Sequence, residues 1–201
     1  PEEGPVFVAG LGNRAMTPDA VGPLAIEHLL ITRHLKEVLP DFRPTSAAAA
    51  GVLGTTGLES AEWVRGLSQA SECAAVVVID ALAARSLQRL CTTIQLSSTG
   101  IIPGSGVGNR RLALNEELLG VPVISVGVPT VVDARTLALD LLGDGEGTEE
   151  PAALAGRGAS LFVTPKDVDA QVREIGKILG YGISLALQPG LAVEDLTALL
   201  E

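Results

Sequence analysis

Apolar runs and amphipathic segments alternate along most of the chain. Each run is bounded by Gly, Pro or polar residues and has the length of a strand that is buried on both faces. The clearest run is rich in β-branched residues and ends in an acid, Asp80. Strands are predicted at residues 5–10, 47–53, 74–80, 91–96 and 122–128.

The segments between these runs carry apolar residues at helical spacing. In the first of them, Leu24, Ile31 and Leu35 share one face. Thr17 is a suitable N-cap for that helix, with Pro18 at the first helical position. Helices are predicted at residues 17–38, 58–67, 130–142 and 165–186.

Continuous apolar strands that alternate with helices are typical of a parallel sheet covered on both faces. We therefore predict a single α/β domain over residues 1–201, with a mostly parallel sheet and helices on both faces. Residues 143–158 are acidic and Gly-rich, and we predict a flexible loop there.

The composition of the chain disfavours proteins that bind nucleic acid, span a membrane or depend on disulfides. Apolar residues make up 47% of the 201 residues but aromatic ones only 2%, so the core is built from Ala, Val, Leu and Ile. The net charge of −10 disfavours direct binding to nucleic acid. No signal peptide and no apolar run of about 18 residues is visible, so we expect a soluble cytoplasmic protein that does not contact membranes. Cys73 and Cys91 form no disulfide framework.

Two aspartates follow predicted strands and are the main candidates for chemistry. Asp19 lies after Gly10-Leu-Gly-Asn13, in the expected first helical turn, where backbone N–H groups favour the ionised form. Asp80 closes the most apolar strand, and an acid there is costly unless it is paired or functional. In a parallel sheet both face the crevice beyond the carboxyl ends of the strands, so one can act as base and the other as acid.

Each acid also has an ordinary structural interpretation. Asp19 could simply help to cap its helix, and Asp80 could be held by backbone N–H groups or by Arg85. Gly10-x-Gly12-x-x-Ala15 resembles a dinucleotide fingerprint only weakly, because no acid follows a second strand about 20 residues on.

Two further segments contribute supporting candidates. Residues 99–109 hold Gly104, Ser105, Gly106 and Gly108, which let the backbone approach a ligand or else form a surface loop. Asp133 follows the strand at 122–128 and either orients a partner or bonds local N–H groups as scaffold.

Other catalytic classes have little support. His28 and His34 have no Cys, His or acid at a metal-binding spacing, so we predict no metal and no cofactor. No Gly-x-Ser-x-Gly elbow occurs, which disfavours a serine hydrolase.

The combination of these motifs resembles the germination protease family of spore-forming bacteria. The resemblance rests on GLGNRAMTPDAVGP, VVVIDALAARS, TGIIPGSGVGN and VPVISVGVPTVVDA, supported by GTTGLES, ITRHL and LFVTPKDVD. It covers almost the whole chain.

The resemblance implies more than the spacing does. It implies an atypical aspartic endopeptidase, with a fold like that of the hydrogenase maturation peptidases, that degrades small acid-soluble spore proteins in the germinating spore core. The acids that match the essential pair are Asp19 and Asp80, and we add Asn13 to the supporting residues. Members are zymogens that assemble as homotetramers.

The chain departs from the pattern of the germination protease family in two ways. We expect that the N-terminal part of the family is missing here, and Ile102 stands where the family often has His. Two alternatives stay open: a metal-dependent maturation-type peptidase that uses the same acids as ligands, and a catalytically silent homologue that binds a peptide or nucleotide.

Overall fold

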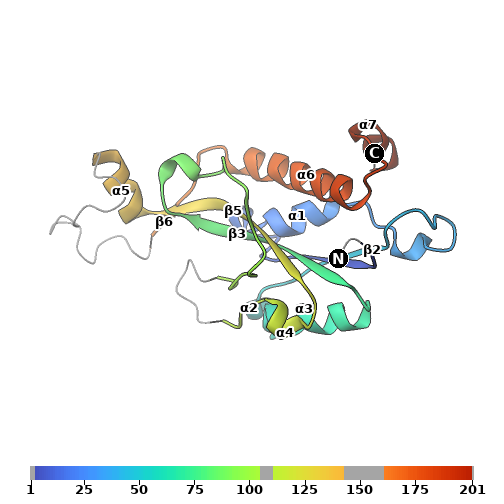
Figure 1. Ribbon diagram of the computed structural model, residues 1–201. Coiled ribbons are helices and arrows are strands. Elements are labelled where there is room, and N and C mark those ends of the chain that lie inside the picture. Colours follow the sequence, from blue (N-terminus) through green and yellow to red (C-terminus); the bar gives the residue numbers. More distant parts are fainter. Residues whose placement is uncertain (1–2, 105–110, 143–160, 201) are drawn as a thin grey trace.

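A six-stranded sheet forms the centre of the computed structural model, which describes residues 3–104, 111–142 and 161–200 (Figure 1). Ser105, Gly106, Gly108 and the predicted loop at 143–158 lie outside these ranges. The strand order is β2-β1-β3-β5-β4, and β6 also pairs with β5. The strands are β1 Val6–Gly10, β2 Thr45–Ala49, β3 Ala75–Ala84, β4 Gln95–Ser97, β5 Val123–Asp133 and β6 Phe162–Val163.

Strands β2, β1, β3 and β5 are parallel, whereas β4 and β6 run antiparallel to β5. Helices cover both faces of this sheet, with α1, α6 and α7 on one side and α2, α3 and α4 on the other, while α5 extends beyond one end (Figure 1). The prediction of a mostly parallel α/β sheet with two covered faces is therefore confirmed. The helices are α1 Val21–Glu27, α2 Leu53–Thr56, α3 Ser60–Ala70, α4 Glu116–Leu119, α5 Ala134–Leu142, α6 Val168–Leu187 and α7 Val193–Leu200.

Alternation along the central strands divides the core into two layers. In β1, Val6 and Val8 face α1 and α6, whereas Phe7 and Ala9 face α3 and α4. Burying such side chains stabilises the fold by roughly 1.5–3 kcal/mol each. This explains why the central strands are apolar without interruption.

Glycines let α1 approach both the sheet and α6. A Cβ on Gly10 would lie 2.4 Å from the carbonyl oxygen of Gly22 in α1. A Cβ on Gly180 in α6 would lie 2.7 Å from the carbonyl oxygen of Ala25. Both contacts are with backbone atoms that cannot move aside, so the α1–sheet and α1–α6 packing needs these glycines.

The helix predicted at 17–38 is wrong in extent. A 3₁₀ turn at Thr17–Asp19 precedes α1, which ends at Glu27, and a second 3₁₀ turn follows at Arg33–Leu35. The Leu30 N–H donates to Ser184 Oγ of α6 at 3.0 Å, which replaces a bond within the helix. Thr17 is not the N-cap either, since Met16 occupies that position without a side-chain bond.

Strand lengths also differ from prediction. β3 continues four residues past Asp80, and β5 continues to Asp133, through residues predicted as helix. A β-bulge near Leu82 adds Thr130 to β5, because Leu82 pairs with Pro129 and Ala83 with Val131. The strand predicted at 91–96 is only Gln95–Ser97, and α7 was not predicted.

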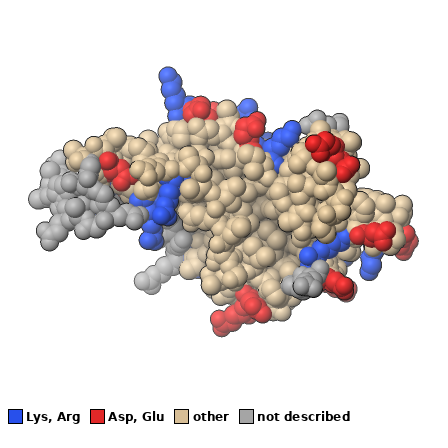
Figure 2. Space-filling model, turned by 45° about the horizontal axis from the view of Figure 1, so that its top comes forward, with Lys and Arg blue, Asp and Glu red and all other residues tan. Residues whose placement is uncertain are grey.

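Charged side chains of both signs are scattered in small separate groups over the face shown in Figure 2. Within the described ranges, no helix is long and apolar enough to cross a membrane.

Two glycines of α6 test the packing of that helix on α1. We expect Gly180→Ala to lower the free energy of unfolding by about 2 kcal/mol, because the new methyl group meets fixed backbone. Gly182→Ala is the matched control: nothing lies within 4 Å of its Cβ position, so helix propensity should raise stability by up to about 1 kcal/mol. Urea denaturation measures both, and equal effects would contradict the packing argument.

Candidate active site

The site begins where β1 ends beside β3. The last pair between these strands is Gly10 with Ile79, and the Leu11 N–H donates to the Ile79 carbonyl at 2.8 Å. The chain then leaves the sheet at Gly12. Asp80 is the next residue of β3 and pairs with Gly127 of β5. It therefore lies at the point where the sheet loses one strand.

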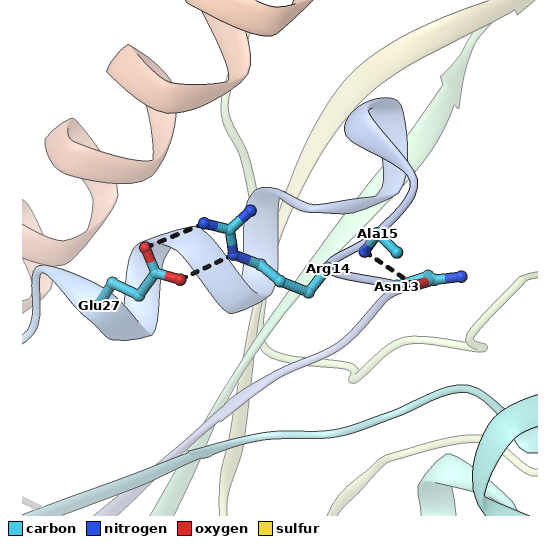
Figure 3. Close-up of polar contacts among 4 residues, drawn as sticks. All are labelled: Asn13, Arg14, Ala15 and Glu27. Atoms are coloured by element: carbon cyan, nitrogen blue, oxygen red, sulfur yellow. Dashed lines mark hydrogen bonds and ion pairs between the residues drawn. The ribbon is translucent and has the colours of Figure 1, made fainter.

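The turn from Gly12 to Asp19 places the second carboxylate at this point. The Asn13 N–H donates to Asp19 Oδ2 at 2.8 Å. Gly12 has φ +113°, and a Cβ there would lie 2.0 Å from the Asp19 carbonyl oxygen, so only glycine fits. Asn13 Oδ1 accepts from the Ala15 N–H at 3.0 Å, which closes the turn (Figure 3).

Side chains tie the same turn to the helices and to β5. Arg14 pairs with Glu27 of α1 at 2.7 Å and points away from Asn13 and Ala15 (Figure 3). Thr17 Oγ1 donates to Asp169 of α6 at 2.8 Å. Thr130 Oγ1 donates to the Pro18 carbonyl at 2.6 Å. Asp19 is thus held by contacts from three separate elements.

The Asp80 carboxyl is nearly removed from solvent, with 5% of its surface exposed. Burial raises its pKa to about 7, and the negative charge of Asp19 adds to this rise. The Ala81 N–H, which donates to Asp80 Oδ1 at 3.0 Å, and the charge of Arg111 act in the opposite direction. A large fraction of Asp80 therefore carries a proton at neutral pH.

Asp19 lies in a different environment. Burial raises its pKa, while the Asn13 N–H and Arg111 lower it. A backbone N–H group does favour the ionised form of Asp19, as predicted, but partial burial outweighs this effect and leaves the pKa raised overall. The more polar surroundings nevertheless make Asp19 the readier of the two to ionise, which is the split that a base and an acid require.

Arg111 is a site residue that the sequence reasoning missed. Its positive charge acts on both carboxylates. Leu114, three residues later, pairs with Ile101 in an antiparallel bridge, and Gly104, three residues after Ile101, lines the cavity beside the acids. The available signal was the Arg110-Arg111 doublet directly after the Gly-rich loop.

A cavity of about 360 Å³ opens at the two carboxylates, beyond the carboxyl end of β1. Most of its wall is apolar, and the acids supply the ionisable groups among its described lining residues. It is lined by Met16, Pro18, Asp19, Asp80, Ala81, Leu82, Ala83, Ile102, Gly104, Thr130, Val131, Phe162 and Thr164.

The remaining candidates divide between site and scaffold. Asn13 supports Asp19 through its backbone, and Gly104 reaches the cavity. Asp133 does not line the cavity. It accepts from the Thr136 N–H at 2.8 Å and Oγ1 at 2.6 Å, and although burial raises its pKa, these bonds leave it lowered overall. This is the scaffold interpretation of Asp133.

No group of three or more His, Cys, Asp or Glu side chains that could hold a metal ion occurs in the part of the chain that the structure describes.

The carboxylate of Asp80 accepts a hydrogen bond from a backbone N–H, as one of the alternatives for this residue predicted. Arg85 is not among the groups that shift the pKa of Asp80.

Comparison with known proteins identifies the family. The model of a family described as germination protease matches residues 1–143. The germination protease of Clostridium perfringens is 44% identical over 230 aligned positions, which cover 100% of this chain and 71% of the relative. The chain belongs to the germination protease family. It is a protease that acts in spore germination.

Two other similarities extend this comparison. The germination protease of Bacillus subtilis is 54% identical over 139 positions, covering 67% of this chain and 38% of that protein. A solved structure of the [NiFe] hydrogenase maturation protease HycI from Thermococcus kodakarensis aligns with a TM-score of 0.47 at 18% identity, covering 91% and 92% of the two chains. This degree of structural similarity carries no argument about chemistry.

The raised pKa of Asp80 predicts a cost in stability. Between about pH 4 and its pKa of about 7, the native carboxyl holds a proton that the unfolded chain releases, so stability falls as pH rises. Asp80→Asn removes this effect. At about pH 8 it should raise the free energy of unfolding by a few kcal/mol, with about 4 kcal/mol as the upper bound, and at about pH 4 it should have little effect.

Denaturant unfolding at both pH values measures the difference. Asp133→Asn is the control, because the pKa of Asp133 is lowered and its replacement should give no gain at the higher pH. A gain for Asp80→Asn that is the same at both pH values would contradict the assignment.

Proposed function

We propose that this protease is an endopeptidase that degrades small acid-soluble spore proteins, and that Asp19 and Asp80 form its catalytic pair. The observation that carries the proposal is the meeting of two partly or fully buried carboxylates at one sheet end, where the charge of one raises the pKa of the other. A pair of carboxyl groups in this setting is unfavourable for folding, and the charge of Arg111 offsets only part of that cost, which supports a functional role for the pair.

The environments of the two acids suggest their roles. In its ionised form, Asp19 takes a proton from a water molecule that attacks the scissile carbonyl. Asp80 keeps a proton near neutral pH and delivers it to the carbonyl oxygen or to the leaving amine. A backbone N–H at Gly104, which lines the cavity, is a candidate donor to the oxygen that gains negative charge.

The cavity fits a polypeptide substrate. Its apolar wall, which includes Leu82, Ile102 and Phe162, suits an aliphatic or aromatic side chain next to the scissile bond. Arg111 adds positive charge beside the acids and offsets part of their repulsion.

A metal-dependent peptidase is the second candidate, because aspartates also bind metal ions. The described residues offer the two acids without a third metal-ligating side chain beside them, which favours hydrolysis without a resident metal. Activity that is lost in a chelator and restored by one metal would favour the metal-dependent enzyme instead. A silent binding homologue would bind peptide without turnover.

We also propose that the complete protein is a homotetramer, is made as a zymogen and acts in the spore core. Light scattering at micromolar concentration measures the assembly, and a monomer in the full-length mature form would contradict it.

The paired mechanism predicts a characteristic set of variants. Asp19→Asn and Asp80→Asn should each abolish cleavage of a purified small acid-soluble spore protein while the fold is kept. The double variant should be little worse than either, because groups that act as a unit are not additive. Cleavage rate and circular dichroism test this, with Asp133→Asn as an active control. A folded single variant that keeps more than about a tenth of the rate, a loss under ~1.4 kcal/mol, would exclude the pair.

Activity should depend on pH through both acids. It should fall as pH rises through about 7, where Asp80 loses its proton, and fall again on the acid side as Asp19 gains one. Arg111→Gln removes a charge that lowers both pKa values, so both limbs should move to higher pH.

The profile of kcat/KM against pH measures this shift. Arg111→Lys keeps the charge and should move the limbs less, and Arg85→Gln, which replaces an exposed arginine, should leave them in place. If the pH dependence of kcat/KM is the same in Arg111→Gln as in the unmodified protein, the charge of Arg111 does not influence the two acids.

A further inference from the structure

Strand β3 has a free edge directly beside the acids. Its pairing with β1 ends at Ile79, but its pairing with β5 continues to Ala84. The residues from Asp80 to Ala84 therefore have a neighbouring strand on one side only, among the residues that the structure describes. An unpaired strand edge presents backbone N–H and C=O groups that can bind another extended chain.

The backbone groups of Ala81 point to this free side. Successive residues of a strand direct their N–H and C=O groups to opposite edges. The Ile79 carbonyl accepts from Leu11, so it faces β1, and Ala81, two residues further on, faces the same way. The Ala81 N–H instead donates to the Asp80 carboxylate, and β1 has already turned away before it could reach the Ala81 carbonyl.

The cavity follows this edge. Four successive residues of β3, from Asp80 to Ala83, line it. Because side chains alternate between the two faces of a sheet, a cavity over one face would contact only every second residue. Contact with all four indicates that the cavity extends along the backbone edge, in the space that β1 would fill if it were longer.

Nearby residues keep this space open. The turn that follows β1 is held away by the hydrogen bond from Thr130 Oγ1 to the Pro18 carbonyl at 2.6 Å. Gly12, with its φ of +113°, allows the sharp exit of the chain from the sheet. Ile102 and Gly104 also line the cavity.

From this arrangement we infer that the substrate segment containing the scissile bond binds as an added strand along the free edge of β3, from Asp80 to Ala83. The inference rests on the proposed function and names how that site holds its substrate. The occupant is an extended polypeptide that is recognised mainly through its backbone. Four residues of β3 span roughly 13 Å, which matches about four substrate residues.

Strand addition explains how the peptide bond reaches both acids. A strand in the position of β1 lies about 4.8 Å from β3, and therefore next to Asp80. This position beside β3 becomes free where Leu11 leaves the sheet, close to the turn that carries Asp19. Alternate substrate side chains then face the apolar wall of the cavity, and the intervening ones face the opposite side of the sheet.

The test uses the unmodified protease and a set of synthetic peptides. The parent is a decapeptide that spans a bond cleaved in a small acid-soluble spore protein. Each variant carries one N-methyl group, placed in turn on each backbone nitrogen except that of the scissile bond. Inhibition constants are measured in competition with cleavage of the intact spore protein.

A strand uses every second N–H for pairing with one neighbour. Around the scissile bond, we expect N-methylation to weaken binding about fivefold at alternate positions and less than about twofold at those between, since each lost hydrogen bond is worth roughly 1 kcal/mol. N-methyl groups near the ends of the decapeptide are the internal control and should have little effect. A uniform loss, or one without a period of two, would overturn strand addition.

The two proposals fail in different ways. If neither the spore protein nor the parent peptide is cleaved, the proposed function is wrong. If both are cleaved but the alternating pattern is missing, only the inferred mode of binding is wrong.

Discussion

Burial of the Asp80 carboxyl at the end of β1 is the constraint on which the rest of the site depends. A carboxyl in the middle of a buried strand retains its proton unless it has an ion partner. Here the charge of Asp19 strengthens that tendency, and Arg111 limits it without removing it. The apolar sheet therefore does more than position an acid, because it sets the proton affinity that acid chemistry near neutral pH requires.

The same arrangement explains why the turn after β1 is so firmly held. Two carboxylates repel one another, and a loosely held Asp19 would move towards solvent. The Asn13 N–H, the Arg14–Glu27 pair and the Thr17–Asp169 bond each limit that movement. The choice of residue is most restricted at Gly12, where any side chain would collide with the backbone of Asp19.

Sequence reasoning identified what depends on local pattern. The apolar strands, the parallel sheet and the meeting of Asp19 with Asp80 all follow from periodicity and from the rule that parallel strands end at a common edge. It missed features that depend on distant partners. The first helix ends early because Leu30 bonds Ser184, 154 residues away, and the segment that carries Arg111 is tied beside the cavity by the bridge between Leu114 and Ile101. The extension of β3 was hidden by its alanines, which have weak strand propensity.

The β-bulge in β5 affects how the turn that carries Asp19 is positioned relative to the strand that carries Asp80. The extra residue, Thr130, is the one whose hydroxyl holds the Pro18 carbonyl. Before it, β5 pairs with β3 residue by residue, and after it the pairing continues with the register shifted by one residue, in the part of β5 that also pairs with β6. A single inserted residue thus joins two parts of the site, because β5 pairs with Asp80 before it and contributes Val131 to the cavity wall after it. Deleting this residue would therefore remove the hydrogen bond to Pro18 and shift Val131 relative to β3 in a single step.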